Sequence, residues 1–405
     1  RETARRYGFE EYDGPPLESL DLYTAKSGDE IVNQLYNFTD KGGRNVSLRP
    51  EMTPTLARMA GARAGALRKP VRWFSIPQLF RYERTQRGRL REHFQWNVDI
   101  LGEEDISADA EVVAVALDSL RSLGLTSSDV VARFNDRRLL ERLVLGAGVQ
   151  PEKLGAAYAA IDKLTREPAE RIRAKLVENA AVTDAVADRV MQIFTHHDLE
   201  SLRTAYASEG GVILELDRLR AYEAHLAALG FKDYVQFDAA IVRGLAYYTG
   251  TVFEIFDRAG ELRAICGGGR YDDLLGAVSG TRLPGVGFGM GDVVLGELLA
   301  DRGLLPPTTQ SVDYYLVWVG GDERAVTLRL AQALRARGSS VLYGLRSAGV
   351  GKQFKDADAR GARRVIVIGA DEVKSGEVLI REMATGSEER ASLAALMAAD
   401  TDEAN

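Results

Sequence analysis

Arginines are concentrated in one short stretch of an otherwise acidic chain. Ten Lys or Arg residues fall between residues 56 and 91, against one acidic residue, Glu83. Five of them lie within residues 80–91: Arg81, Arg84, Arg87, Arg89 and Arg91. Guanidinium groups stay charged and bind phosphate oxygens in pairs, so this stretch suits a polyphosphate. A solvated basic loop, the common outcome for a charge run, is the alternative.

A strand with one polar face follows the arginines. Side chains alternate between the two faces of a strand, so residues 94–100 predict two different surfaces. The polar face carries Gln95, Asn97 and Asp99. The other face carries Trp96, Val98 and Ile100. The polar face of this strand lies beside the arginines, and its opposite face is expected to pack in the core. This combination favours a binding site over a simple solvated loop.

A second strand is lined with glycine. Residues 285–291 alternate Gly with apolar residues, and a bare backbone face lets a flat ring such as adenine approach. Tight packing against a helix is the alternative, and Asp292 is expected to cap the helix that follows. A dinucleotide fingerprint is excluded because position 290 is Met290. A Walker loop is excluded because Arg346 replaces its first Gly and Gln353 its Ser or Thr.

One arginine lies among small residues and tyrosines. Residues 242–250 read Val-Arg-Gly-Leu-Ala-Tyr-Tyr-Thr-Gly, with Arg243 as their only charge, and they precede a strand that contains Glu254. Residues 266–273 read Cys-Gly-Gly-Gly-Arg-Tyr-Asp-Asp and bring the backbone close to a neighbour. These neighbours indicate a guanidinium fitted into a tight pocket. Cys266 is interpreted as a small buried apolar residue, not a nucleophile.

Composition limits the class of protein. The chain has 405 residues, 45% of them apolar, which predicts two or three domains. Its net charge is 52 − 59 = −7, so binding of nucleic acid needs a local basic patch. A single cysteine excludes an internal disulfide and a Cys-rich zinc site. With no signal-peptide pattern and no apolar run of about 18 residues, a soluble cytoplasmic protein is expected, its true N-terminus upstream of residue 1.

The pattern of elements predicts a domain with a helical insertion and a second domain. Residues 1–135 and 231–302 mix strands and helices, whereas 136–230 has helical spacing throughout. Residues 303–311 have the composition of a linker. Residues 312–405 alternate strands and helices, which predicts a small parallel sheet in an α/β domain.

Local patterns set finer boundaries. A hairpin is expected from strands 251–256 and 262–266 around a turn that ends in Gly260. In the second domain we expect strands at 314–319, 341–343 and 364–368 and helices at 322–337 and 351–360.

Taken together, these motifs resemble the class II histidyl-tRNA synthetases over nearly the whole length. Residues 243–254 and 266–273 are similar to the two signature segments of that family, and residues 80–99 to class II motif 2. The resemblance implies an α+β catalytic domain with an antiparallel sheet, a helical insertion, and a C-terminal α/β anticodon-binding domain. It also implies a homodimer built largely on motif 1. In this chain, the region of Pro15 resembles the end of that motif.

The resemblance implies roles for individual residues. The catalytic residues would be Arg81 and Arg243. The histidine-binding residues would be Glu51, Thr53, Arg81, Gln95, Asp99, Arg243, Tyr247 and Tyr248, the first two on the ammonium group and Asp99 with the tyrosines on the imidazole. The ATP-binding residues would be Arg81, Glu83, Arg89, Gly289 and Gly291. No metal ligand from the protein is expected beyond Mg²⁺ carried by ATP.

The implied activity is ligation of L-histidine to tRNA(His) through histidyl-adenylate. Two departures from the family stand out: Ala246 where Asp is frequent, and Val293 and Val294 where motif 3 ends in Glu-Arg. Either one of three other arginines replaces the missing one (Arg84, Arg270 or Arg282), or ATP binding is weakened. The alternative is a synthetase-like regulatory subunit of ATP phosphoribosyltransferase, which does not aminoacylate. A complete C-terminal domain favours the ligase, because the regulatory subunit resembles the catalytic domain alone.

Overall fold

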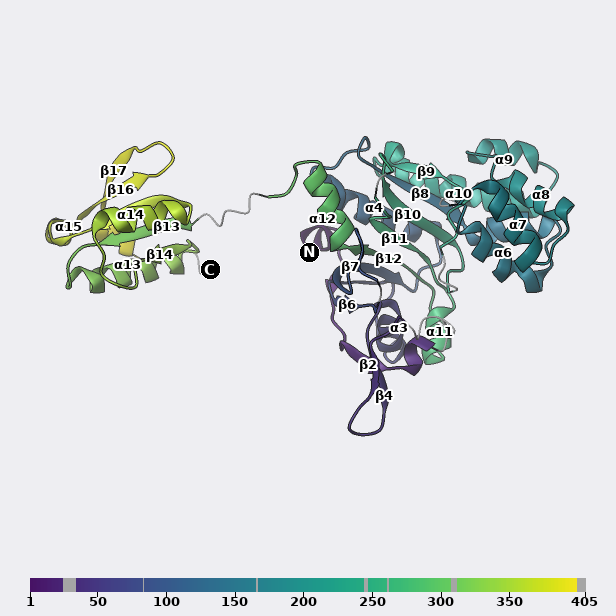
Figure 1. The fold of residues 1–405 in the computed structure, drawn as a ribbon, viewed down its shortest axis with the longest axis horizontal. Coiled ribbons are helices and arrows are strands. Elements are labelled where there is room, and N and C mark those ends of the chain that lie inside the picture. Colours follow the sequence, from purple (N-terminus) through teal and green to yellow (C-terminus); the bar gives the residue numbers. More distant parts are fainter. Residues whose placement is uncertain are drawn as a thin grey trace. The chain divides into compact units, whose positions relative to one another are not determined.

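The computed structural model describes residues 1–24, 34–82, 84–164, 167–243, 247–260, 262–306 and 312–398. The chain forms two compact units, Arg1–Leu305 and Pro306–Asn405 (Figure 1). The division between them falls within residues 303–311, the segment predicted as a linker.

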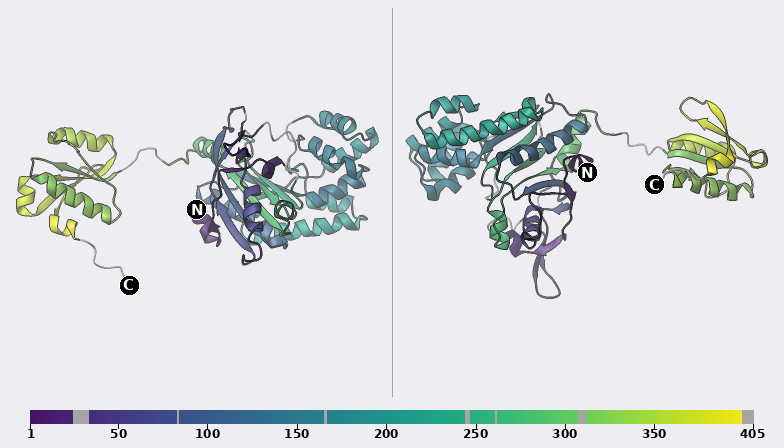
Figure 2. Two further views of the ribbon diagram at one scale, coloured as in Figure 1. Left: turned by 90° about the horizontal axis from the view of Figure 1, so that it is seen from below. Right: turned by 180° about the vertical axis from the view of Figure 1, so that it is seen from behind.

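In the described part of the chain, the first unit is built on a nine-stranded sheet (Figure 2). Its strands are β1 (Glu10–Glu11), β5 (Val71–Ser75), β6 (Gln78–Phe80), β7 (Glu92–Leu101), β8 (Val130–Asp136), β9 (Val235–Phe237), β10 (Thr251–Asp257), β11 (Cys266–Arg270) and β12 (Gly285–Gly291). The order is β1-β5-β7-β12-β11-β10-β8-β9, and β6 pairs with β7. Pairing is antiparallel except for β1 with β5 and β8 with β9. The predicted antiparallel α+β domain is confirmed.

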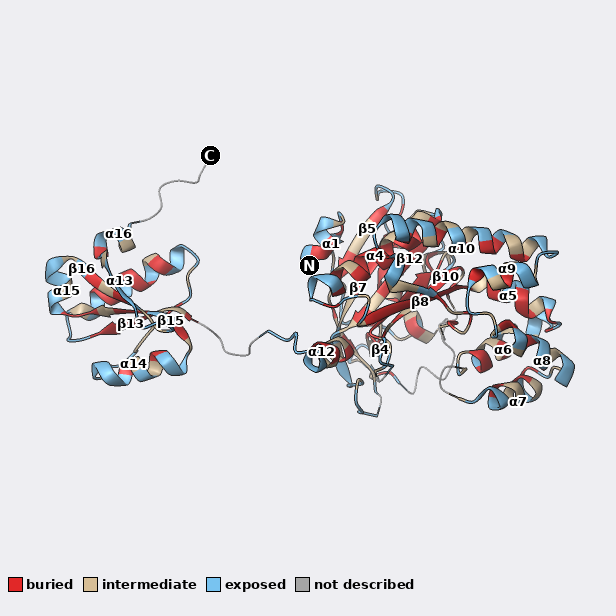
Figure 3. Cartoon of the chain, turned by 90° about the horizontal axis from the view of Figure 1, so that it is seen from above, coloured by how far each residue is buried: buried red, intermediate tan, exposed pale blue. Residues whose placement is uncertain are grey.

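Alternation along β7 gives the sheet two unlike faces. Val98 and Ile100 point to the back face and join the main core with helix α4 (Ile106–Ser122). Asp99 points to the front face, where it lies against β12. The central strands are mostly buried, and the front-face residue Asp99 is buried as well as Val98 and Ile100 (Figure 3). The predicted division of this strand into an apolar and a polar face is confirmed.

Two short helices cover one end of the front face. They are α3 (Thr53–Gly61) and α11 (Leu274–Ser279), and they pack with Leu101 and Val252 in a second core cluster. A small sheet precedes α3 in the chain, with strand order β2 (Leu17–Ser19), β4 (Asn45–Leu48) and β3 (Asn37–Thr39). The short helix α1 (Glu2–Arg6) packs on α4 instead.

Two local predictions are wrong. Strand β11 begins at Cys266, where the predicted strand 262–266 ends, because residues 267–269 find backbone partners on both sides in β10 and β12. That pairing outweighs the low strand propensity of glycine. Helix α12 (Asp292–Asp301) is capped by Gly291 without a side-chain hydrogen bond, so Asp292 is its first residue and not its cap.

Helices follow β8 as the sequence predicted. They are α5 (Arg137–Gly146), α6 (Leu154–Ile161), α7 (Ala169–Asn179), α8 (Asp184–Ile193), α9 (Leu199–Ala205) and α10 (Gly210–Ala228), with short 3₁₀ turns at Pro151–Lys153 and Lys232–Tyr234. Helix α10 packs along α4, and buried side chains run from the insertion into the main core. The boundaries of the insertion stay predictions, because the first unit contains both parts.

The second unit has a mixed sheet instead of the parallel sheet expected. Its strands are β13 (Val312–Trp318), β14 (Val341–Tyr343), β15 (Ala362–Ile368), β16 (Glu377–Glu382) and β17 (Glu388–Ser392), in the order β14-β13-β15-β16-β17. Its helices are α13 (Glu323–Ala336), α14 (Val350–Ala359), α15 (Ala370–Ser375) and α16 (Leu393–Met397). The first three strands are parallel, and β16 and β17 add an antiparallel hairpin. The sequence pattern did not predict this hairpin.

Candidate active site

The front face of β12 is bare backbone, because its glycines have no side chains there, and side chains of β7 pack directly against it. A Cβ at Gly287 would collide with the carboxylate of Asp99, and one at Gly289 would lie 2.7 Å from Cδ of Gln95. Two side chains predicted to bind histidine therefore lie directly over these glycines. At Gly289 the side chain of Gln95 covers the bare surface that was expected for adenine. ATP binding by Gly289 and Gly291 stays a prediction.

Arg243 lies over β11 with a strained backbone. Its φ is +59°, in the left-handed region, which costs a non-glycine residue about 1–3 kcal/mol. Nη1 donates a hydrogen bond to Oε1 of Glu254 at 2.6 Å, and the guanidinium occupies the place of a Cβ on Gly267. Burial would lower the pKa of Arg243, but Tyr248 and Glu254 raise it above its usual value. The group therefore stays cationic at every physiological pH.

Glu51 is the carboxylate that the two predicted catalytic arginines share. Burial raises its pKa, and the charges of Arg81 and Arg243 oppose that rise. Oη of Tyr247 donates to Oε2 of Glu51 at 3.0 Å. Nε of Arg81 donates at 3.0 Å to the carbonyl of Pro50, the residue before Glu51. Segments that are far apart in the sequence thus bring two cations and a carboxylate together, as expected from the arginine-rich segment and the isolated arginine.

Asp99 lies in a pocket of tyrosines. Oη of Tyr271 donates a hydrogen bond to Oδ1 of Asp99, and the Tyr271 ring packs edge-on against Tyr247 with centroids 6.1 Å apart. Tyr248 lies tilted beside Tyr247 at 5.0 Å. Burial raises the pKa of Asp99 to about 7, although the hydrogen bond from Tyr271 lowers it. A carboxyl group that titrates near 7 suits a partner that titrates in the same range, such as imidazole.

The arginine-rich loop docks on helix α12. The backbone N–H of Gly88 donates to Oε1 of Glu297 at 3.0 Å. Arg87 forms ion pairs with Glu297 at 3.5 Å and Asp301 at 3.4 Å. Arg89 closes the turn by pairing with Gln86. The loop is therefore held by carboxylates at its tip, while Arg81 at its start bonds to the carbonyl of Pro50.

Arg270 does not replace the missing motif 3 arginine. It lies on the back face, 1% exposed, in an ion pair with the buried Asp109 of α4. Moving it to a substrate would strand that carboxylate in the core. Of the other candidates, Arg84 is exposed on the arginine-rich loop and Arg282 is exposed after α11.

Another arginine lies beside the position of the missing one. Cγ2 of Val294 is 3.3 Å from the place of a Cβ on Gly88, and Cδ of Arg263 is 3.8 Å from the same place. The Arg263 side chain is exposed and lies beside the tip of the arginine-rich loop. The sequence analysis did not single out this residue.

Other residues named in the sequence lie at the start of helix α3, in strand β11 or outside the described residues. Thr53 begins helix α3, two residues after Glu51. Glu83 and Ala246 lie outside the described residues. Cys266 is buried on the back face of β11, and burial raises its pKa, as expected of an apolar packing residue.

Two residues of the site were missed: Glu254, which pairs with Arg243, and Tyr271, which bonds to Asp99. Both lie in segments that the sequence analysis quoted. Alternation along β10 puts Glu254 among apolar neighbours, a signal for a charged residue with a partner.

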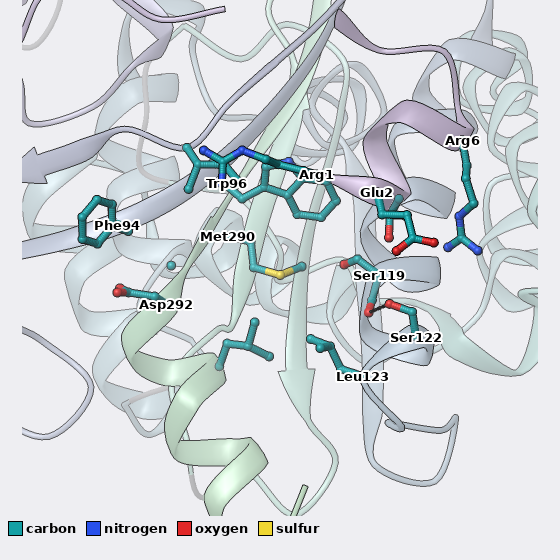
Figure 4. A pocket seen from close by; sticks show the side chains of 14 residues that line it. Arg1, Glu2, Arg6, Phe94, Trp96, Ser119, Ser122, Leu123, Met290 and Asp292 are labelled. Atoms are coloured by element: carbon teal, nitrogen blue, oxygen red, sulfur yellow. Dashed lines mark hydrogen bonds between the residues drawn. The ribbon is translucent and has the colours of Figure 1, made fainter. Parts of the chain in front are cut away.

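A cavity of about 630 Å³ lies on the opposite face of the sheet (Figure 4). Trp96 and Met290 line it from β7 and β12, and Leu123 and Leu295 line it from the side of the helices. Arg1 also lines it. This cavity is distinct from the cluster around Glu51 and Asp99, which lies on the front face.

Among the described residues, no group of three His, Cys, Asp or Glu side chains is placed to hold a metal ion. The helices that the structure describes include none with both the length and the apolar composition of a transmembrane span.

The chain is similar to known histidine–tRNA ligases in sequence and in fold. A curated histidine–tRNA ligase of Opitutus terrae is 44% identical over 390 residues, which cover 96% of this chain and 89% of that protein. The chloroplastic/mitochondrial histidine–tRNA ligase of Arabidopsis thaliana is 39% identical over 96% of this chain and 79% of that protein. The crystal structure of histidyl-tRNA synthetase from Nostoc sp. PCC 7120 has the same fold, with a TM-score of 0.82, 24% identity, and coverage of 98% and 92%.

Family models divide the chain as the two units do. The model described as an anticodon binding domain matches residues 313–399, within the second unit. The model described as histidyl-tRNA synthetase matches residues 1–291, which contain the front-face cluster around Glu51 and Asp99. With this match and relatives about 40% identical over nearly its whole length, the chain belongs to the histidyl-tRNA synthetase family.

Proposed function

We propose that the chain is a histidine–tRNA ligase, which activates L-histidine with ATP to histidyl-adenylate and transfers it to the 3′ end of tRNA(His). One observation carries the proposal: Arg81 bonds to the carbonyl before Glu51, Tyr247 bonds to Glu51 itself, and Arg243 pairs with Glu254 in the same front-face cluster, beside a buried Asp99 among tyrosines. A pocket of this kind suits a small zwitterion with an ionisable ring that must meet a phosphate.

Activation joins two anions, the histidine carboxylate and the α-phosphate of ATP. The carboxylate is its own nucleophile, so fixed cations are needed more than a general base. Arg81 would bridge the carboxylate and the α-phosphate, and Arg243 would stabilise the charge that builds there. The pairing of Arg243 with Glu254 holds its guanidinium in place before the substrates arrive.

The remaining groups would select histidine. Glu51 and Thr53 would hold the ammonium group, and Gln95 would assist. Asp99, with Tyr247 and Tyr248, would hydrogen bond to the imidazole. A site that hydrogen bonds to both ring nitrogens rejects an apolar side chain strongly, because its own buried polar groups would lose their partners.

ATP would bind toward the arginine-rich loop. Glu83 and Arg89 would contact it, and Mg²⁺ would arrive with its phosphates as part of the substrate. Val294 replaces the usual motif 3 arginine, and we assign that role to Arg263, because it lies beside Val294 at the tip of the loop. Its guanidinium would contact the terminal phosphates.

The second unit would bind the anticodon. On α14, Lys352 and Lys355 are exposed, whereas Arg360 is paired with Asp356 at 3.1 Å. The two lysines are therefore the cations of that helix we assign to tRNA. Recognition at both ends of the tRNA would use both units.

A homodimer is the proposed assembly. The large cavity on the back of the sheet is lined by Phe94, which is 50% exposed, and Leu123, which is 43% exposed. Such exposed apolar side chains next to α1, in the region that resembles motif 1, support burial by a second copy. Light scattering would test this assembly. The cytoplasmic location stays a prediction.

Histidine-dependent ATP–pyrophosphate exchange tests the activity. We expect exchange with L-histidine and none with other amino acids, followed by charging of tRNA(His). A full-length chain that folds but shows no exchange would refute the ligase and favour the regulatory subunit. The match of residues 313–399 to an anticodon binding domain argues against that alternative.

A further inference from the structure

Four consecutive residues hold the backbone around the catalytic cluster. They are residues 135–138, where β8 ends and α5 begins, and we call them the junction. Asp136 is the N-cap of α5 and accepts a hydrogen bond from the N–H of Arg138 at 2.7 Å. The other junction residues bond to backbone on both sides of Arg243 and the tyrosine pair.

The junction fixes the backbone before Arg243. Nδ2 of Asn135 donates to the carbonyls of Ala239 at 2.9 Å and Ile241 at 3.2 Å. Nη1 of Arg137 donates to the carbonyl of Val242 at 3.2 Å. Asn135 is 2% exposed, so water cannot replace its amide. The carbonyl that immediately precedes Arg243 therefore has a charged donor from another segment.

The junction also fixes the backbone after the tyrosine pair. The N–H of Arg137 donates to the carbonyl of Gly250 at 2.9 Å, and Nε of Arg138 donates to that of Thr249 at 3.2 Å. Nη2 of Arg138 pairs with Asp272 at 3.1 Å, and the N–H of Asp272 donates to Oγ1 of Thr249 at 3.0 Å. Both described ends of the segment are thus tied to one short stretch of chain.

These ties explain how Arg243 keeps its left-handed backbone. A strained conformation persists only where the surroundings determine it more than once. We propose that Asn135, Arg137 and Arg138 are positioning residues for adenylate formation, an inference that rests on the proposed function. They set the place of Arg243 through the backbone and act on no reacting atom.

The junction also connects the site to the helical insertion. The Arg137 guanidinium lies 4.5 Å from the centroid of the Tyr158 ring on α6 while it bonds to Val242. A shift of α5 or α6 would therefore move the carbonyl beside Arg243. This one side chain therefore links the insertion to the backbone next to Arg243.

Three variants of Arg137 and its neighbour test the role. Arg137→Met removes the donor to Val242, Arg137→Lys retains a cation, and Arg138→Gln weakens the contact with Thr249. Arg142→Met is the matched control, because Arg142 is on the same helix but bonds to Glu215 of α10 at 3.1 Å. Pyrophosphate exchange gives kcat and both KM values, and thermal unfolding gives Tm.

We expect Arg137→Met to lower kcat of exchange about ten- to a hundredfold, the scale of a small misplacement in an active site. The KM for ATP should stay within about twofold, Arg137→Lys should recover part of kcat, and Arg142→Met should change Tm but not kcat. If Arg137→Met does not fold, Arg138→Gln decides by the same readouts.

The outcomes separate the two proposals. An active wild type whose kcat is unaffected by both Arg137→Met and Arg138→Gln would overturn the positioning role alone. So would a loss of kcat in Arg142→Met equal to that in Arg137→Met, because it would reflect stability only. An inactive wild type would overturn the proposed function itself.

Discussion

At the scale of single residues, Arg243 combines a left-handed backbone, a carboxylate partner and a place over a glycine. The sequence predicted a guanidinium in a tight pocket from its small neighbours. It did not predict the backbone conformation, because that depends on hydrogen bonds from residues about a hundred positions earlier. Local composition identifies the residue, and distant contacts set its geometry.

Removal of the Arg243 side chain tests its role directly. Arg243→Ala should lower the rate of adenylate formation by roughly two orders of magnitude or more, as expected for the loss of one preorganised charge donor. Single-turnover formation of histidyl-adenylate measures it. An unchanged rate would exclude Arg243 from the mechanism. Ala at this position keeps the unfavourable φ, so Tm should not rise.

Asp99 should make both stability and histidine binding depend on pH. Its pKa rises from 3.8 to about 7 on folding, so its ionisation opposes folding increasingly as the pH rises from about 4 to 7. Asp99→Asn should therefore stabilise the free protein at pH 8 more than at pH 5. It should also raise the KM for histidine tenfold or more, since bonds to charged groups contribute about 1.5–3 kcal/mol.

Chemical denaturation at several pH values and exchange kinetics check the two effects on Asp99→Asn. A stability difference that is constant with pH would contradict the burial of an ionisable Asp99. An unchanged KM for histidine would remove the residue from recognition of the imidazole.

Arg263 provides a test on the ATP side. Arg263→Ala should raise the KM for ATP about tenfold or more and leave the KM for histidine within twofold, because a bound phosphate loses a charged donor. Arg282→Ala, another exposed arginine, is the control. Equal effects of the two substitutions would argue against the assignment of Arg263.

At the scale of elements, the glycines of β12 and the polar face of β7 form one surface. Alternation predicted which residues share each face, and that was sufficient to place Asp99 opposite the core. The sequence could not show that Asp99 and Gln95 themselves fill the space over the glycines. Strand register decides this, and it depends on pairing between segments about 190 residues apart.

A methyl group on the front face should disturb this surface. Gly287→Ala places a Cβ against the Asp99 carboxylate, so we expect a loss of about 1–3 kcal/mol in the free energy of unfolding and little exchange activity. Gly276→Ala in α11 is the control, because the nearest atom to its Cβ outside the helix backbone would be Cα of Arg282, at 3.7 Å. Urea unfolding measures both, and equal stability would contradict the close approach.

At the scale of the whole molecule, the front-face cluster and the residues that match an anticodon binding domain lie in separate units. The division at Leu305 was predictable from the linker composition, and the three parallel strands of the second unit from their spacing. The hairpin of β16 and β17 was not, because charged residues such as Glu388 and Glu389 obscure the strand pattern. Strand β17 is mostly exposed and carries little hydrophobic signal.

The separation predicts a substitution that affects tRNA alone. Lys355→Ala should weaken tRNA binding and reduce its dependence on salt by about 0.7–0.9 in log–log slope, the effect of one lost phosphate contact. Pyrophosphate exchange should be unchanged. Lys374→Ala, an exposed lysine of α15, is the control. An unaltered salt slope in Lys355→Ala would dismiss α14 as a contact.

The position of Cys266 gives the molecule a built-in reporter. It is the only cysteine of the chain, it is 2% exposed, and it lies in the central sheet directly before Gly267, on which Arg243 rests. A thiol reagent can therefore reach it only when this part of the sheet opens. The labelling rate would measure how often the sheet opens locally around Cys266. If bound substrates slow the labelling, the same measurement reports substrate binding without an engineered probe.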